Sequence, residues 1–191
     1  MEPLIASVRL TVATLLICVA GYTVVILAFA QIAVPDSAQG SLITGKDGKI
    51  IGSRLIAQSF TQPRYFWPRP SAAGKDGYDA MNAAGSNKSP TSSDLTERAS
   101  KIIAQYGASA ATPLPPELAA ASGGGLDPHI SEHAALYQAE RVAKARGLPQ
   151  SDVESLIRRA GFASGGFLTP DGIVNVLELN LALDSIQSQS Q

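Results

Sequence analysis

The chain divides into an apolar N-terminal stretch and a polar remainder. Residues 10–34, LTVATLLICVAGYTVVILAFAQIAV, contain no Asp, Glu, Lys, Arg or His. The hydrocarbon core of a bilayer, roughly 30 Å thick, needs about 20 helical residues, and a helix satisfies its own backbone hydrogen bonds. The pattern predicts a transmembrane helix over 10–34, after a short tail over 1–9. A soluble domain over 35–186 and a disordered polar tail over 187–191 should follow.

The same stretch has an alternative interpretation as a signal peptide. Ala28-Phe29-Ala30 has the small-x-small pattern of a cleavage site. The apolar part of a signal peptide runs about 7 to 15 residues, however, and this stretch is longer. Length therefore favours a retained helix over cleavage after Ala30.

Small or weakly polar residues recur along this stretch in steps of four and three: Ser7, Thr11, Thr14, Cys18 and Gly21. In an α-helix this spacing places them on one face, where another membrane helix could approach closely. We therefore predict a seam for a partner helix. The alternative is that such residues are simply tolerated in a membrane helix.

Beyond Pro35, extended and helical patterns are mixed. Two extended segments, 41–44 and 49–59, flank the hairpin turn Lys46-Asp47-Gly48. A second turn, Thr169 to Gly172, lies between Phe167-Leu168 and the extended segment 173–177. Apolar spacing and capping residues predict helices over 94–106, 117–121, 132–146, 151–160 and 178–186, with Asp94 and Ser131 as caps. The mixture favours the α+β class, or α/β with a small sheet.

Two segments have unusual compositions. Residues 61–71, TQPRYFWPRPS, place three aromatic residues among prolines and arginines, which predicts a rigid extended loop. Three adjacent aromatic side chains cannot all face one core, so at least one should lie at the surface or stack on an arginine; the alternative is that they fill the core of the domain. Residues 122–131, SGGGLDPHIS, contain three glycines that allow positive φ angles and close backbone approach.

Composition argues against several functions. The net charge is −1 with both signs interspersed, so nothing predicts binding to nucleic acid. The single cysteine lies in the apolar stretch, which leaves the soluble domain without disulfides or cysteine-based metal sites.

No residue pattern in this chain matches a known catalytic motif. His129 and His133 are four residues apart with acidic neighbours, but the spacing is not that of HExxH, and Ser122 is not in a G-x-S-x-G turn. We predict no catalytic, cofactor-binding or metal-binding residue in this chain. The alternative is a membrane-anchored hydrolase or metal-binding protein that uses Ser122, Asp127, His129 and His133.

Six blocks of sequence resemble one family, the C subunit of the Kdp potassium-transporting P-type ATPase of bacteria. In order they are GSRLIAQSF (52–60), YFWPRPSA (65–72), GSN (85–87), SGGGLDPHIS (122–131), RVAKARGL (141–148) and VNVLELNLALD (174–184). The chain departs from the family at 88–93, where KSPTSS replaces the usual LGPTNP, and at Gly124, where the family usually has Ser.

The resemblance implies a single-pass protein of the bacterial inner membrane, with a cytoplasmic N-terminus and a periplasmic domain. Its partners would be a channel-like potassium-binding subunit, a catalytic P-type subunit and a small fourth subunit. ATP and Mg²⁺ would be used by the catalytic subunit, and K⁺ would be transported. The family's C subunit is described as an assembly factor and as a catalytic chaperone that raises the ATP affinity of the catalytic subunit.

No catalytic residue transfers from the family, so the candidate residues are those expected at partner interfaces. One set is the membrane-helix face defined above. The other set lies in the two unusual loops, which we expect to present a rigid surface to the potassium-binding subunit: Tyr65, Phe66, Arg69 and Ser71, and Gly125, Asp127, His129 and Ser131.

Overall fold

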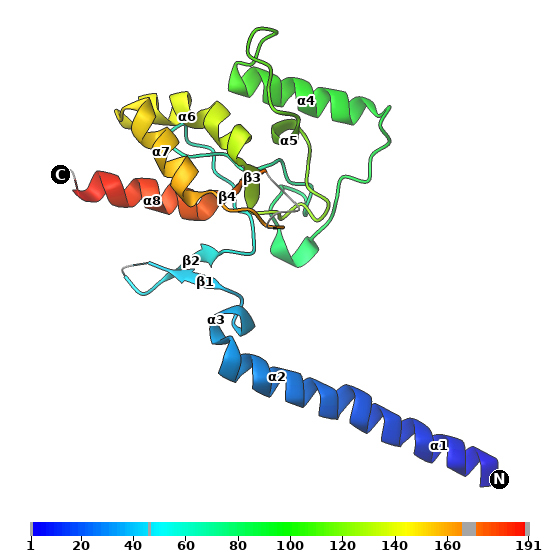
Figure 1. The fold of residues 1–191 in the computed structure, drawn as a ribbon. Coiled ribbons are helices and arrows are strands. Elements are labelled where there is room, and N and C mark those ends of the chain that lie inside the picture. Colours follow the sequence, from blue (N-terminus) through cyan, green and yellow to red (C-terminus); the bar gives the residue numbers. More distant parts are fainter. Residues whose placement is uncertain (1, 46, 166–170, 190–191) are drawn as a thin grey trace. The chain divides into compact units, whose positions relative to one another are not determined.

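A computed structural model describes residues 2–45, 47–165 and 171–189. The chain forms two compact units, Met1–Ile51 and Gly52–Gln191, and each is described by itself. Figure 1 shows the order of the elements along the chain.

The first unit begins with one helix of 32 residues, Glu2–Ala33, long and apolar enough to cross a membrane. It consists of α1 (Glu2–Leu15), a π-helical segment η1 (Leu16–Gly21) and α2 (Tyr22–Ala33). The helix includes residues 2–9, which the sequence assigned to a tail. It ends at Ala33 with Val34 as its C-cap, and Pro35 opens the short helix α3 (Pro35–Ala38) because proline is tolerated in a first turn.

A two-stranded sheet follows, formed by β1 (Leu42–Thr44) and β2 (Ile50–Ser53). Gly48 has φ 78 in the connecting turn, which confirms the predicted hairpin. The second strand stops at Ser53 rather than Ser59. The side-chain hydroxyl of Ser53 accepts the Leu55 N–H at 3.0 Å, so a local side-chain bond replaces the strand ladder.

The core of the second unit is built on three of its α-helices and a small sheet. Strands β3 (His129–Ser131) and β4 (Ile173–Asn175) pair antiparallel, with Ile130 opposite Val174, and Phe162 forms an isolated bridge to Ile173. The predicted strand Phe167-Leu168 and Thr169-Pro170 of the predicted turn lie outside the described residues. The described partners of β4 are therefore β3 and Phe162.

Strand β4 ends two residues earlier than predicted because Asn175 caps the next helix. Its side-chain oxygen accepts the Glu178 N–H at 3.2 Å, and α8 runs over Val176–Gln189 rather than from Glu178.

Helices α6 (Glu132–Arg146) and α7 (Gln150–Ala160) match their predictions closely. The Ser131 hydroxyl accepts the Ala134 N–H at 3.0 Å at the start of α6, and Gly147 ends it with φ 67. The inner face of α6 is made of small side chains, including the buried Ala135, Ala139 and Val142.

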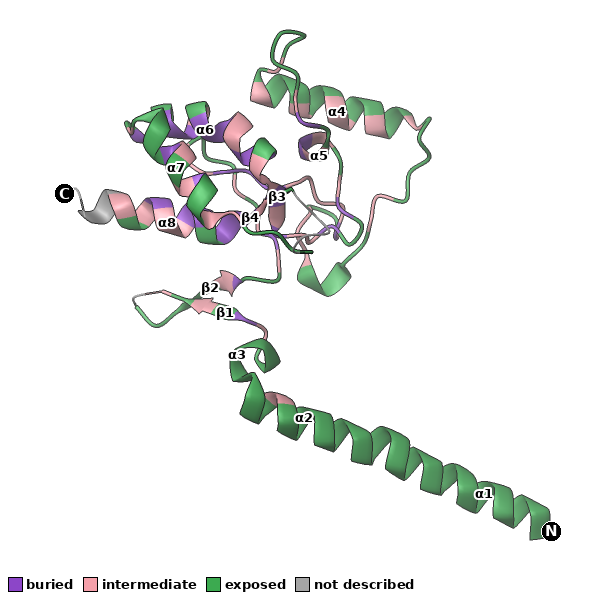
Figure 2. Ribbon diagram, viewed as in Figure 1, coloured by how far each residue is buried: buried purple, intermediate pink, exposed green. Residues whose placement is uncertain are grey.

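The remaining elements are η2 (Ala80–Asn82), α4 (Ser93–Tyr106) and α5 (Pro116–Ala119). Ser92 occupies the N-cap position of α4, so the prediction that Asp94 is the cap was wrong: Asp94 lies in the first turn and pairs with Lys88. No residue of α4 is buried, and its ribbon is coloured only as exposed or intermediate in Figure 2.

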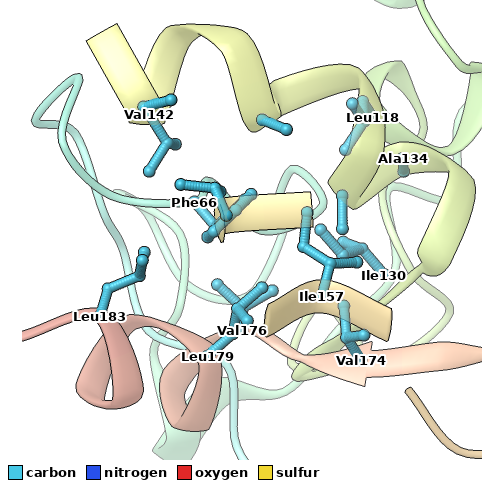
Figure 3. Packing of buried hydrophobic residues seen from close by; sticks show 14 residues of the cluster. Phe66, Leu118, Ile130, Ala134, Val142, Ile157, Val174, Val176, Leu179 and Leu183 are labelled. Atoms are coloured by element: carbon cyan, nitrogen blue, oxygen red, sulfur yellow. The ribbon is translucent and has the colours of Figure 1, made fainter. Parts of the chain in front are cut away.

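The core lies between α6, α7, α8 and the β3–β4 sheet. Figure 3 shows Phe66, from the aromatic loop, pointing into this cluster near Val142 and Leu179. A mixed fold with small two-stranded sheets confirms the α+β class.

Candidate interaction site

The aromatic loop is held by two buried amide side chains. Asn180 accepts the Phe66 N–H at 2.8 Å and donates to the Phe66 carbonyl at 3.1 Å. Gln138 does the same for Trp67, at 2.8 and 3.0 Å. Each amide side chain makes the pair of backbone hydrogen bonds that a neighbouring strand would make. The loop at Phe66 and Trp67 can therefore enter the core without a strand partner, because its backbone N–H and carbonyl groups are paired.

Arginine side chains pack on the remaining aromatic rings, and Arg64 is one of them, 5.4 Å from the centroid of Tyr65. The Arg141 guanidinium lies 3.8 Å from the centroid of Trp67 and donates to the carbonyls of Pro63 and Tyr65. Burial lowers the pKa of Arg141 to about 10, which leaves it charged at neutral pH. Arg146 lies 5.1 Å from the centroid of Tyr65. Both interpretations of the loop are therefore correct in part: Phe66 fills the core, and its neighbours stack on arginines.

A charged group on α8 completes the loop's attachment. Asp184 accepts hydrogen bonds from Arg146 at 2.8 Å and from the Tyr65 hydroxyl at 3.1 Å. Sequence reasoning missed these holding residues: Gln138, Asn180, Arg141, Arg146 and Asp184. A polar residue on the apolar face of a helix could have revealed them. Asn180, which lies beside the buried Leu179 and Leu183, is an example.

The two loops singled out by sequence are joined by Arg69. Its Nη1 lies 3.3 Å from an oxygen of Asp127, and the same side chain donates to the carbonyls of Ala120 and Ala121 at 3.4 Å. Asp127 in turn accepts the backbone N–H of His129 at 3.0 Å. The hydrogen bonds from His129, and secondarily the charge of Arg69, hold the pKa of Asp127 below its usual value.

Ser71 and Tyr78 fix the far end of the aromatic loop. The Ser71 hydroxyl oxygen accepts the N–H groups of Ala73 at 3.1 Å and Tyr78 at 2.7 Å. The Tyr78 hydroxyl donates to the Arg69 carbonyl at 2.9 Å, and burial raises its pKa to about 12. Ser71 thus stabilises a turn in its own chain.

Gly125 is required where the glycine-rich loop turns back on the domain. It has φ 71, and a Cβ atom there would lie 2.6 Å from the Ala84 carbonyl oxygen. Gly123 and Gly124 are exposed and have open space around them. The serine that the family usually has in place of Gly124 would therefore fit.

The structure gives most of the candidate loop residues partners within the domain. Phe66 is fully buried, and the Ser131 hydroxyl caps α6 and donates to Glu117. Tyr65, Arg69, Asp127 and His129 are half-buried and keep part of their surface accessible. Contact between any of these residues and a partner stays a prediction.

The membrane-helix face is interrupted by the π-helical segment. Ser7, Thr11 and Thr14 lie in α1, whereas Cys18 and Gly21 lie in η1, where i→i+5 hydrogen bonds widen the turn. The wider turn changes the phase that the four-and-three spacing assumes, and a common partner face for the five residues stays a prediction. The Ser7 hydroxyl also donates to the Pro3 carbonyl at 2.8 Å, within its own helix.

The residues proposed for hydrolysis or metal binding are used differently. Ser122 is buried, and its hydroxyl oxygen accepts the Asp127 N–H at 3.4 Å. His129 lies against Asp127 and the Phe162 ring, while His133 is exposed on the first turn of α6. Within 2–45, 47–165 and 171–189, no group of three or more His, Cys, Asp or Glu side chains could hold a metal ion.

The sequence is similar to known proteins of one family. Residues 4–185 match the family described as KdpC: K+-transporting ATPase, c chain. The chain is 63% identical over 188 residues to the Potassium-transporting ATPase KdpC subunit of Parvibaculum lavamentivorans, covering 98% of this chain and 99% of that one. It is 44% identical over 194 residues to the KdpC subunit of Gemmatimonas aurantiaca (100% and 96%), and 42% over 181 residues to that of Citrifermentans bemidjiense (91% and 92%). The chain therefore belongs to the KdpC family, the c chain of the K+-transporting ATPase, an accessory subunit of that complex rather than its catalytic one.

Proposed function

We propose that this chain holds together a bacterial high-affinity K⁺-uptake ATPase as its single-pass subunit, with the N-terminus in the cytoplasm and the domain in the periplasm. Its partners are the channel-like potassium-binding subunit, the catalytic P-type subunit and the small fourth subunit. The observation that carries this proposal is the unburied apolar helix in a chain that matches the family over residues 4–185.

The helix supports a role in assembly because its own chain does not cover it. The 32 residues of Glu2–Ala33 bury no side chain, and large apolar residues such as Leu10, Ile17 and Phe29 are more than half exposed. Lipid can cover such a surface, and so can the helices of other subunits. In a subunit of a membrane complex, the helix then serves as a joint between chains as well as an anchor.

The domain supports the same role because its two candidate loops are rigid. Arg69, Asp127 and the amides of Gln138 and Asn180 fix the loops before any partner binds. A preorganised surface loses less conformational entropy on association, which strengthens binding. The half-buried groups of these loops are our candidates for contact with the potassium-binding subunit.

This chain raises the ATP affinity of the catalytic subunit indirectly. ATP and Mg²⁺ act in the catalytic subunit, this chain binds neither, and K⁺ is the transported ion. A domain in the periplasm can change ATP binding only by favouring one conformational state of the assembled complex. The coupling must then be reciprocal: ATP bound to the catalytic subunit should tighten the attachment of this chain.

Co-purification tests assembly. The tagged full chain is expressed with its partner genes under potassium starvation and isolated in a mild detergent. We expect a complex with K⁺-stimulated ATP hydrolysis. A matched variant carries a leucine-rich segment of equal length in place of residues 10–34, and should insert but recover less complex. Equal recovery would show that the helix is only an anchor, and no partner recovered with the wild-type chain would overturn the proposal.

ATP titration tests the coupling separately. The concentration of ATP that half-saturates hydrolysis is compared between complexes with and without this chain. We expect it to be lower when the chain is present. An unchanged value with intact co-purification would remove the effect on ATP affinity and leave the role in assembly.

A further inference from the structure

Helix α4 buries no side chain, whereas α5, α6, α7 and α8 of the same unit each bury at least one. Its apolar residues Leu95, Ala99 and Ile102 are only half-buried, and Ile103 is 42% exposed. By contrast, α7 buries Val153 and Ile157, and α8 buries Leu179 and Leu183. Burial of apolar side chains is the main source of stability for a helix in a protein, so α4 is held weakly.

Clefts open to solvent lie along this helix, from its first turns to its last. One of about 500 Å³ lies at its N-terminal turns beside Leu95 and Arg98. One of about 210 Å³ is lined by Ile102 and Tyr106 of α4 and by Trp67 and Pro70 of the aromatic loop. Two more, of about 440 and 460 Å³, adjoin Tyr106 and Ile103. Side chains that line such clefts contact solvent where a core helix would contact packed side chains.

Polar atoms beside these clefts are buried without hydrogen-bond partners among the described residues. Arg98 Nε and the Tyr106 hydroxyl on α4, and Arg141 Nε on α6, are covered but make no hydrogen bond to any described residue. A buried polar atom without a partner destabilises the closed arrangement, and water can supply the missing hydrogen bond if the helix moves away.

Few directional bonds hold α4 in place. Among the described residues, its side-chain hydrogen bonds are local: Ser100 donates to the Thr96 carbonyl, and Asp94 pairs with Lys88 in the preceding connector. Its main anchor is Tyr106, whose ring lies edge-on to Trp67 at 5.0 Å. Both flanks are irregular, with Asn87 at φ 48 before the helix and Gly107 at φ 66 after it. Such flanks can act as hinges.

We infer that α4 is a movable flap, which swings on the connectors around Asn87 and Gly107 and uncovers Trp67 and Pro70 of the aromatic loop while α6, α7 and α8 stay folded. Because α4 buries few contacts in the closed arrangement, its closed and open arrangements differ little in free energy, and both can be populated. The inference concerns the domain alone and does not depend on the proposed role in the complex.

Hydrogen exchange on the full chain in detergent micelles tests the flap directly. We expect amides of Ser93–Tyr106 to exchange at least about tenfold faster than those of α6, at a rate that mild denaturant hardly changes, as for local opening. Tyr106→Phe and Arg98→Met remove buried unpartnered atoms, so each should slow exchange in α4 about fivefold without changing α6.

Matched controls separate this effect from a general gain in stability. Tyr137→Phe removes a hydroxyl that does have a partner, the Thr112 carbonyl at 3.4 Å, and Arg158→Met removes an exposed arginine paired with Glu132. Neither should slow exchange in α4. Acrylamide quenching of Trp67, the only tryptophan, should fall in Tyr106→Phe. Protection of α4 equal to that of α6, or no slowing in both test variants, would overturn the flap.

Discussion

Arg69 and Asp127 connect two loops that are 58 residues apart in the chain, with Nη1 and the carboxylate oxygen 3.3 Å apart. Their side chains are only 25% and 36% exposed, so solvent screens the pair less than it screens an open surface pair. The sequence marked both loops as candidate partner surfaces. The structure shows that each also stabilises the other.

Loss of the Arg69–Asp127 pair, which we call the brace between the two loops, should destabilise the domain itself. We expect Arg69→Met to lower the free energy of unfolding by about 1–2 kcal/mol, because it also leaves the Ala120 and Ala121 carbonyls without their donor. Urea unfolding of the full chain in micelles, followed by Trp67 fluorescence, measures it. The matched control is Arg158→Met: its pair with Glu132 has the same 3.3 Å distance but a 61% exposed arginine, so about 0.5 kcal/mol or less is expected. Equal losses would contradict the brace.

The contribution of Asp127 should depend on pH in a defined direction. The pKa of Asp127 is lowered in the folded protein, chiefly by hydrogen bonds from His129, and returns to about 3.9 on unfolding. Its stabilisation is therefore fully present above about pH 5 and is lost as pH falls through the lower, folded-state pKa. The stability difference between wild type and Asp127→Asn should stay constant from about pH 8 to 5 and shrink below about pH 4. A difference that does not shrink below about pH 4 would contradict this linkage.

The buried amide of Gln138 should be essential to the fold. Gln138→Leu keeps a side chain of similar size but leaves the N–H and carbonyl of Trp67 unpaired in the core. We expect a loss of about 2–5 kcal/mol, measured by the same unfolding experiment. Gln150→Leu, at an exposed position in α7, is the control and should change stability by about 0.5 kcal/mol or less. A tolerated Gln138→Leu would show that water can replace the amide.

Two neighbouring glycines should respond oppositely to alanine. Gly125→Ala forces a Cβ atom to within 2.6 Å of the Ala84 carbonyl oxygen at φ 71, so we expect a loss of about 2–4 kcal/mol. Gly124→Ala meets open space and should be neutral or slightly stabilising. Thermal unfolding of the two variants compares them directly. Similar melting temperatures would mean that the loop can relax around Gly125.

Gly21 tests whether the π-helical segment meets another helix. Gly21→Leu adds bulk where small residues would allow close approach, so we expect severalfold less complex in co-purification. Val24→Leu, at a 65% exposed apolar position, is the control and should recover normal amounts. Unchanged recovery for Gly21→Leu would place the partner on another side of the helix, consistent with the phase shift in η1.

Local sequence determined the elements whose causes lie within a few residues. The apolar run predicted the membrane helix because length and lack of charge suffice, although the helix begins at Glu2 rather than Leu10. Ser131 and Gly147 predicted the ends of α6 because capping is a short-range interaction. The blocks shared with the family identified the chain for the same reason: they are continuous in sequence.

Tertiary structure alone decided how the two loops are used. Asn180 pairs with Phe66 across 114 residues and Gln138 with Trp67 across 71, and no local pattern specifies such partners. The same long-range packing directed Phe66 inward, left Tyr65 and Trp67 on arginines, and joined Arg69 to Asp127. The physical reason is that a buried polar group must be paired, but the fold determines which distant residue is near enough to pair with it.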